Sequence, residues 1–96
     1  MDNAVYWKEF FTAWPVGLDR RGVLVANFGE QIPFDSFMPG DKLLIVDRSV
    51  PDTIGARKIV IPYNNIAAVK FTDVIKNKLF IPLGFAEPPP KRGQER

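Results

Sequence analysis

After Pro15 the chain divides into short apolar segments separated by turn residues, and this spacing constrains the fold more than any other feature. The segments are of strand length, are rich in β-branched and aromatic residues, and recur at intervals of roughly 8–12 residues. Such a pattern is typical of a small, strongly bent antiparallel sheet or barrel. We therefore expect a mainly β fold with a barrel over residues 16–72. The predicted strands are residues 23–28, 31–37, 42–48, 58–63 and 66–71.

Before Pro15, four large aromatic residues recur at the helical spacing i, i+3, i+4, i+7. Asp2 or Asn3 can cap a helix here and Pro15 ends it, so we expect a helix over residues 3–14. The aromatic stripe is expected to cover an open end of the core, although it also fits a docking surface for a partner or a membrane. The single basic residue of the helix, Lys8, argues against a membrane-surface helix. The stripe consists of Trp7, Phe10, Phe11 and Trp14.

The last predicted strand has a competing interpretation. A helix over residues 65–80 would also place Ala67, Phe71 and Val74 on one face. The pair Asn64-Asn65 and the β-branched residues after it favour a turn followed by a strand.

An extra segment, residues 73–86, follows the last strand. Its apolar stretch, residues 79–85, is expected to be extended, either as a further strand or as a contact under a neighbouring subunit. Residues 87–96 contain three prolines with no apolar residue after them, and we expect them to form a disordered basic tail.

The chain has neither cysteine nor histidine. Disulfides, thiolate metal sites, Ser–His pairs and imidazole ligands are therefore excluded, and we expect no metal and no cofactor. Scattered carboxylates are the remaining pattern that fits Mg²⁺ binding or acid–base chemistry. Aspartate is common near turns for structural reasons, so we expect the protein not to be an enzyme. These carboxylates are Asp35, Asp41, Asp47 and Asp52.

A net charge of +2, from 13 basic and 11 acidic residues, is not by itself a signature of nucleic-acid binding. No apolar run has the length of a membrane span, and the N-terminus shows no secretory signal. Apolar residues make up 46% of the chain, which is enough for one core. We therefore expect a single domain over residues 1–86, a cytoplasmic location and no membrane partner.

Residues 59–71, IVIPYNNIAAVKF, resemble the second Sm motif of the Sm/LSm/Hfq family, in which a tight polar loop joins two strands. Asn64-Asn65-Ile66 matches the second half of the Arg-Gly-Asn-Asn loop and the branched residue after it in eukaryotic members. Residues 22–47 resemble the first Sm motif more loosely, with Phe37 near the family's Phe-Asp pair and Lys42 near the position of an Asn. The resemblance covers residues 3–71 and is to small Sm-like proteins of the kind found in marine phage and metagenomic sequence.

This resemblance implies an N-terminal helix on a bent five-stranded antiparallel barrel of the SH3 type. It also implies a homo-oligomeric ring, from pentamer to heptamer, in which the fourth strand of one subunit pairs with the fifth strand of the next. Cyclic closure of this kind leaves no edge strand unpaired. The expected interface residues belong to these two strands and are Ile59, Val60, Ile61, Ala67, Ala68 and Val69.

The resemblance further implies that single-stranded RNA binds at the pore-side loops through base stacking and polar contacts. Tyr63 is then expected to stack on a base and Asn64 to read its edge through the side-chain amide. Asn64 stands where Hfq has a histidine, and the basic residue of the second motif is absent. The alternative is therefore a ring that works through protein contacts without RNA. The expected RNA contacts are Phe37, Met38, Asp41 and Lys42 from the first loop, and Tyr63, Asn64 and Asn65 from the second.

Overall fold

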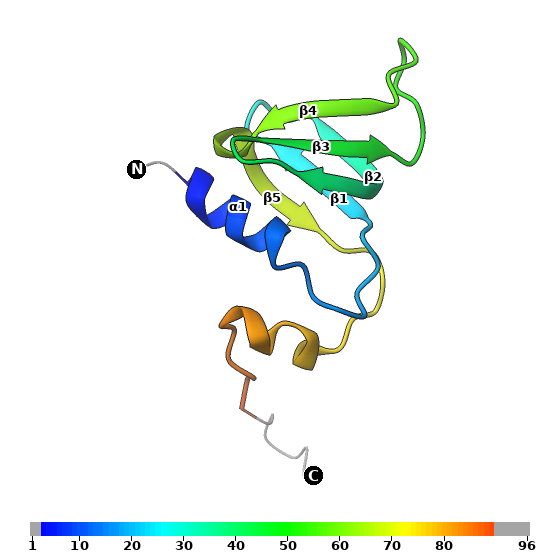
Figure 1. The fold of residues 1–96 in the computed structure, drawn as a ribbon. Coiled ribbons are helices and arrows are strands. Elements are labelled where there is room, and N and C mark those ends of the chain that lie inside the picture. The colour runs from blue at the N-terminus through cyan, green and yellow to red at the C-terminus, as the bar shows by residue number, and fades with distance from the viewer. Residues whose placement is uncertain (1–2, 90–96) are drawn as a thin grey trace.

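A computed structural model describes residues 3–89, which form one α-helix, five strands and three short 3₁₀ helices (Figure 1). The mainly β fold with an N-terminal helix is therefore confirmed. The helix α1 spans Ala4–Thr12, and the strands are β1 (Gly22–Ala26), β2 (Gln31–Pro39), β3 (Leu43–Arg48), β4 (Lys58–Pro62) and β5 (Ile66–Lys70). The 3₁₀ helices are η1 (Tyr63–Asn65), η2 (Asn77–Leu79) and η3 (Ile81–Leu83).

The five strands form one antiparallel sheet in the order β4-β3-β2-β1-β5. The pairing of β2 with β3 shifts register between Phe34 and Ser36. A bulge of this kind inserts one extra residue into a strand, so each side chain after it points to the face opposite to the one that strict alternation predicts. Phe34 and Phe37 are therefore both buried, at 1% and 2% exposure, although strict alternation would place them on opposite faces.

Within residues 3–89 the five-stranded sheet is not closed into a barrel, which corrects the expected barrel. β4 and β5 are its two edges and do not pair with each other. The 3₁₀ helix η1 joins these edges directly, because β4 ends at Pro62 and β5 begins at Ile66. The result is an open, bent sheet whose two edge strands are consecutive in the sequence.

The helix α1 covers the core at the open side of the sheet, as its aromatic stripe predicts. Phe11 is fully buried, and its ring centroid lies 5.0 Å from that of Phe37 in β2. Trp14 follows the helix and lies 4.8 Å from the same ring, while its indole Nε1 donates a 3.0 Å hydrogen bond to the Leu18 carbonyl. The aromatic residues therefore connect α1 to the central strand of the sheet. The remaining core residues are Leu24, Ala26, Ile32, Phe34, Leu44, Val46, Ile61, Tyr63 and Ile66.

The chain beyond β5 forms 3₁₀ turns where an extended segment was expected over residues 79–85. Pro82 lies within η3, and Gly84 ends that turn with a φ of 100°, a conformation that favours glycine. The competing helix over residues 65–80 is wrong, because residues 66–70 form β5. No helix within residues 3–89 is both long and apolar enough to cross a bilayer. The tail expected to be disordered covers residues 87–96, of which residues 87–89 form no helix or strand and residues 90–96 lie outside the described residues.

Candidate functional site

Three connections meet at one end of the sheet, and we call them the loop cluster: the β1–β2 turn (27–30), the β2–β3 turn (40–42) and η1. The Asn27 side-chain amide donates a 3.2 Å hydrogen bond to the Asn64 carbonyl, and its backbone N–H donates to the Asn65 carbonyl at 2.8 Å. The Tyr63 hydroxyl donates to the Gly40 carbonyl, also at 2.8 Å. η1 therefore holds both turns in place (Figure 1).

A salt bridge between α1 and the β2–β3 turn neutralises Asp41, one of the two acidic residues of the loop cluster, while Glu30 lies exposed in the β1–β2 turn. Lys8 Nζ lies 2.6 Å from Asp41 Oδ1, and the hydrogen bond lowers the pKa of the Asp41 carboxyl while it raises the pKa of Lys8. The neighbouring Lys42 is exposed. Asp41 therefore faces solvent as half of an ion pair, and Lys42 supplies the positive charge of the turn.

Two of the expected RNA contacts are buried aromatic rings. Phe37 and Tyr63 are 2% and 1% exposed, so neither ring has a face open to a nucleotide base. Burial raises the pKa of the Tyr63 hydroxyl, which keeps this group protonated as the donor to Gly40. The stacking role expected of Tyr63 is therefore corrected: its ring fills the core beneath η1, and only its neighbours in the turn reach solvent.

The other expected RNA contacts remain accessible but fall into two groups. Asn64 is exposed and Asn65 is half-buried, both in η1. Met38, Asp41 and Lys42 line a shallow groove on the outer face of the sheet, which also includes Val60 of β4. The structure therefore brings the two loops together through Gly40 and Tyr63, while Met38 lies in the outer groove with Val60 of β4.

Phe28, which was not among the expected site residues, is 63% exposed in the β1–β2 turn. Its neighbour Asn27 makes the two hydrogen bonds to η1, so the Phe28 ring belongs to the same loop cluster as Asn64. Gly29 has a φ of 92° and completes the tight turn after it. The available signal was an aromatic residue directly before a turn glycine; the alternation of Leu24 and Ala26 instead favoured including Phe28 in a strand over residues 23–28, whereas β1 ends at Ala26.

The expected interface residues lie on the two free edges of the sheet. In β4, Val60 is 57% exposed, Ile59 is half-buried and Ile61 is part of the core. In β5, Ala67 is exposed, whereas Ala68 and Val69 are half-buried. No other strand of the described chain pairs with the outer side of either edge. Both edges therefore combine free backbone groups with small or branched apolar side chains.

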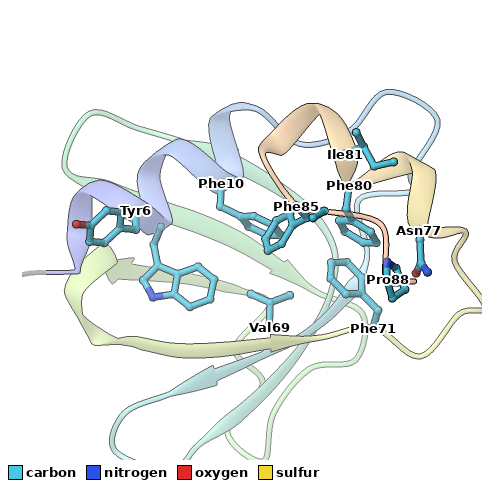
Figure 2. A pocket seen from close by; sticks show the side chains of 11 residues that line it. Tyr6, Phe10, Val69, Phe71, Asn77, Phe80, Ile81, Phe85 and Pro88 are labelled. Atoms are coloured by element: carbon cyan, nitrogen blue, oxygen red, sulfur yellow. The ribbon is translucent and has the colours of Figure 1, made fainter. Parts of the chain in front are cut away.

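An apolar groove of about 610 Å³ lies beside β5, between α1 and the segment after β5 (Figure 2). One wall comes from α1 and includes Trp7 and Phe10, and the floor includes Val69 of β5. The other wall comes from the C-terminal segment, which we define as residues 77–88, and includes Phe80 and Phe85. None of the residues that line the groove is charged.

The carboxylates considered for metal or acid–base chemistry do not form a site. Asp41 pairs with Lys8 and Asp47 with Lys58, while the Asp52 carboxylate accepts hydrogen bonds from two backbone amides of its own loop. Within residues 3–89, no group of three or more acidic side chains is arranged to hold a metal ion.

Comparisons with protein-family models, with curated proteins and with solved structures find no match for the chain.

Proposed function

We propose that this protein is an Sm-like subunit that assembles edge to edge into a homo-oligomeric ring and binds single-stranded RNA at its loop cluster. One observation carries the proposal, namely the strand order β4-β3-β2-β1-β5. This order leaves the two strands that resemble the second Sm motif at opposite edges of one sheet. Exposed edges of this kind are sites of strand addition unless something covers them.

Both edges are chemically suited to such pairing. Each strand has five residues and carries an exposed apolar side chain, Val60 in β4 and Ala67 in β5. When β4 of one copy pairs with β5 of the next, the contact is head to tail, and the growing oligomer keeps one free β4 at one end and one free β5 at the other. Such an interface produces a closed ring when the rotation between neighbours is a simple fraction of a full turn. The family resemblance favours a pentamer to a heptamer.

The loop cluster supplies the groups that single-strand binding needs. Phe28 offers an exposed ring for stacking, Asn64 offers amide donors and acceptors for a base edge, and Lys42 offers positive charge for a phosphate. Because the cluster lies where both edge strands meet η1, ring closure would repeat it once per subunit. RNA would then pass from one copy of Phe28 and Asn64 to the next.

A second candidate function is a ring that acts through protein contacts and binds no RNA. Two observations favour it: the net charge is only +2, and the expected stacking residue Tyr63 is buried. Phosphate contacts supply most of the sequence-independent affinity for nucleic acids, and few basic groups are available here to make them.

The two candidates separate in one set of measurements. Light scattering gives the mass in solution, and fluorescence anisotropy with oligo-U and oligo-A at low salt gives RNA affinity. Phe28→Ala, Asn64→Ala and Lys42→Ala should each weaken RNA binding, with Val74→Ala and Lys76→Ala as matched exposed controls away from the loop cluster. A monomer at micromolar concentration contradicts both candidates. A ring that binds neither oligonucleotide supports the second.

A further inference from the structure

We infer that the apolar groove beside β5 is filled by a second copy of this chain, which lays Ile59 of its β4 into it. The inference rests on the edge-to-edge ring proposed above and extends it. It assigns the C-terminal segment, outside the region of family resemblance, a direct role in subunit contact.

The groove opens at the edge where another copy would pair. Val69 lies on the inner face of β5, because its partner across the β1–β5 ladder is the fully buried Leu24. Figure 2 shows Val69 at the floor of the groove, with Phe10, Phe71 and Phe85 around it. Since β5 is an edge strand, no strand within the described residues occupies the space next to Val69.

Strand stereochemistry decides which side chains of β4 would enter that space. Ile59 and Ile61 oppose Val46 and Leu44 in the β3–β4 ladder, and both partners are fully buried. Ile59 and Ile61 therefore face inward, whereas Val60 faces outward.

In an antiparallel pair, directly opposed residues point to the same face, with Cβ atoms about 4.5–5.5 Å apart. A copy whose β4 pairs with β5 therefore presents an inward-facing isoleucine beside Val69. Ile61 is buried in the core of its own chain and only 3% exposed, so it has little surface left for a contact with the groove. Ile59 is half-buried and retains surface for the groove.

The chemistry of the groove matches this occupant and not the chain's own tail. Apolar and aromatic side chains line the groove almost completely, and the inner face of β4 carries two isoleucines. The chain that follows Pro88 has sequence PPKRGQER, which contains no large apolar residue to fill such a space. The one charged residue of β4, Lys58, lies on the other face of the strand together with Val60. The pairing would therefore bring no charge into the groove.

The C-terminal segment lacks the cover that its aromatic residues require. Phe80 contacts Phe71 at 5.7 Å between ring centroids and contacts Phe85 at 6.2 Å. Even so, Ile81 and Phe85 remain 45% and 56% exposed. Exposed apolar surface of this kind marks an interaction site. A neighbouring β4 beside Val69 would extend the floor of the groove and cover the open side of Phe85.

Single-cysteine variants test the inference directly, because the natural chain contains no cysteine. An Ile59→Cys protein is mixed with a Phe85→Cys protein of different tagged mass, and a short bis-maleimide is added. Each chain then holds one thiol, so a link between the two masses must join two copies. We expect efficient Ile59–Phe85 links. Val74→Cys, at a fully exposed position outside the groove, replaces Phe85→Cys as the control and should link only at background level.

A second measurement uses Phe85→Ser, which changes an exposed side chain and should leave the urea midpoint of the monomer unchanged. We expect it to raise the dissociation constant for assembly about tenfold, because the covered apolar surface is lost. Val74→Ser should leave that constant unchanged.

The outcomes also separate this inference from the proposed ring. Val60→Cys mixed with Ala68→Cys reports the strand pairing itself. Links between positions 60 and 68 without links between 59 and 85, together with normal assembly of Phe85→Ser, overturn the inference and leave the ring intact. A groove that still binds an apolar dye equally well in the assembled protein overturns it too. A monomer with no links of either kind overturns both.

Discussion

The Tyr63 hydroxyl donates a 2.8 Å hydrogen bond to the carbonyl of Gly40, and this contact joins η1 to the β2–β3 turn. Tyr63→Phe keeps the buried ring and removes only the donor, so the Gly40 carbonyl loses its partner. We expect the free energy of unfolding to fall by about 1 kcal/mol, the usual net contribution of one such hydrogen bond. Urea unfolding followed by tryptophan fluorescence measures the change.

Tyr6→Phe is the matched control, because the Tyr6 side chain is 62% exposed. It should leave the urea midpoint unchanged. Equal stability of Tyr63→Phe and the natural protein would mean that the hydroxyl does not hold η1 against the turn.

Phe37 and Phe28 should respond in opposite ways to truncation. Phe37 is 2% exposed and contacts Phe11 and Trp14, so Phe37→Ala should cost about 3–5 kcal/mol of stability. Phe28 is 63% exposed, and Phe28→Ala should change stability by no more than about 0.5 kcal/mol. Under the proposed function, the second variant nevertheless weakens RNA binding, as anisotropy would detect. A large loss of stability in Phe28→Ala would identify its ring as a packing group.

The difference between these two residues shows what could be predicted from the sequence. The aromatic stripe of residues 7–14 predicted both the helix and its burial, because four large rings on one helical face require cover. Alternation could not place Phe37, since the bulge between Phe34 and Ser36 depends on how β2 bends across β1 and β3. A local pattern carries no signal for a bend that arises from pairing on both sides of a strand.

The candidate site was predictable in position more than in detail. The Asn64-Asn65 turn was expected between two strands, and η1 lies there. The depth of Tyr63 depends on the distant Gly40, which no short motif records. Residues 79–85 show a related limit, because an apolar run that contains Pro82 and Gly84 suits either an extended chain or 3₁₀ turns until its packing partners are known.

The Lys8–Asp41 pair predicts a pH dependence of stability. The folded-state pKa of Asp41 lies below its unfolded value, because Lys8 donates a hydrogen bond to the carboxylate. Its contribution is therefore present above the unfolded pKa and is lost as the pH falls through the folded pKa. The pKa of Lys8 is raised, so its contribution is present below its unfolded value and is lost as the pH rises through the folded one.

Lys8→Met removes the partner of Asp41, so it should abolish the contribution of Asp41 to the pH dependence of stability. We expect the pKa of the Asp41 carboxyl, followed by NMR, to return to the ordinary range, and the stability difference from the natural protein to vanish at low pH. Lys42→Met, which changes the exposed residue next to Asp41, is the control. If both variants shift the titration of the Asp41 carboxyl equally, its pKa is set by the general field of nearby charges and not by the 2.6 Å contact with Lys8.

Gly22 lets β5 lie close to β1. A Cβ atom at this position would be 2.7 Å from the Lys70 carbonyl oxygen, and because that atom is backbone, the strand itself would have to move. Gly22→Ala should therefore cost about 1–3 kcal/mol. It should also accelerate hydrogen exchange at β5 amides paired with β1, while amides between β2 and β3 keep their protection relative to the new global stability. Thr72→Ala, an exposed change just beyond β5, should do neither. Uniformly faster exchange across the whole sheet would show that the strain does not concentrate at the β5 edge, which the proposed ring would use.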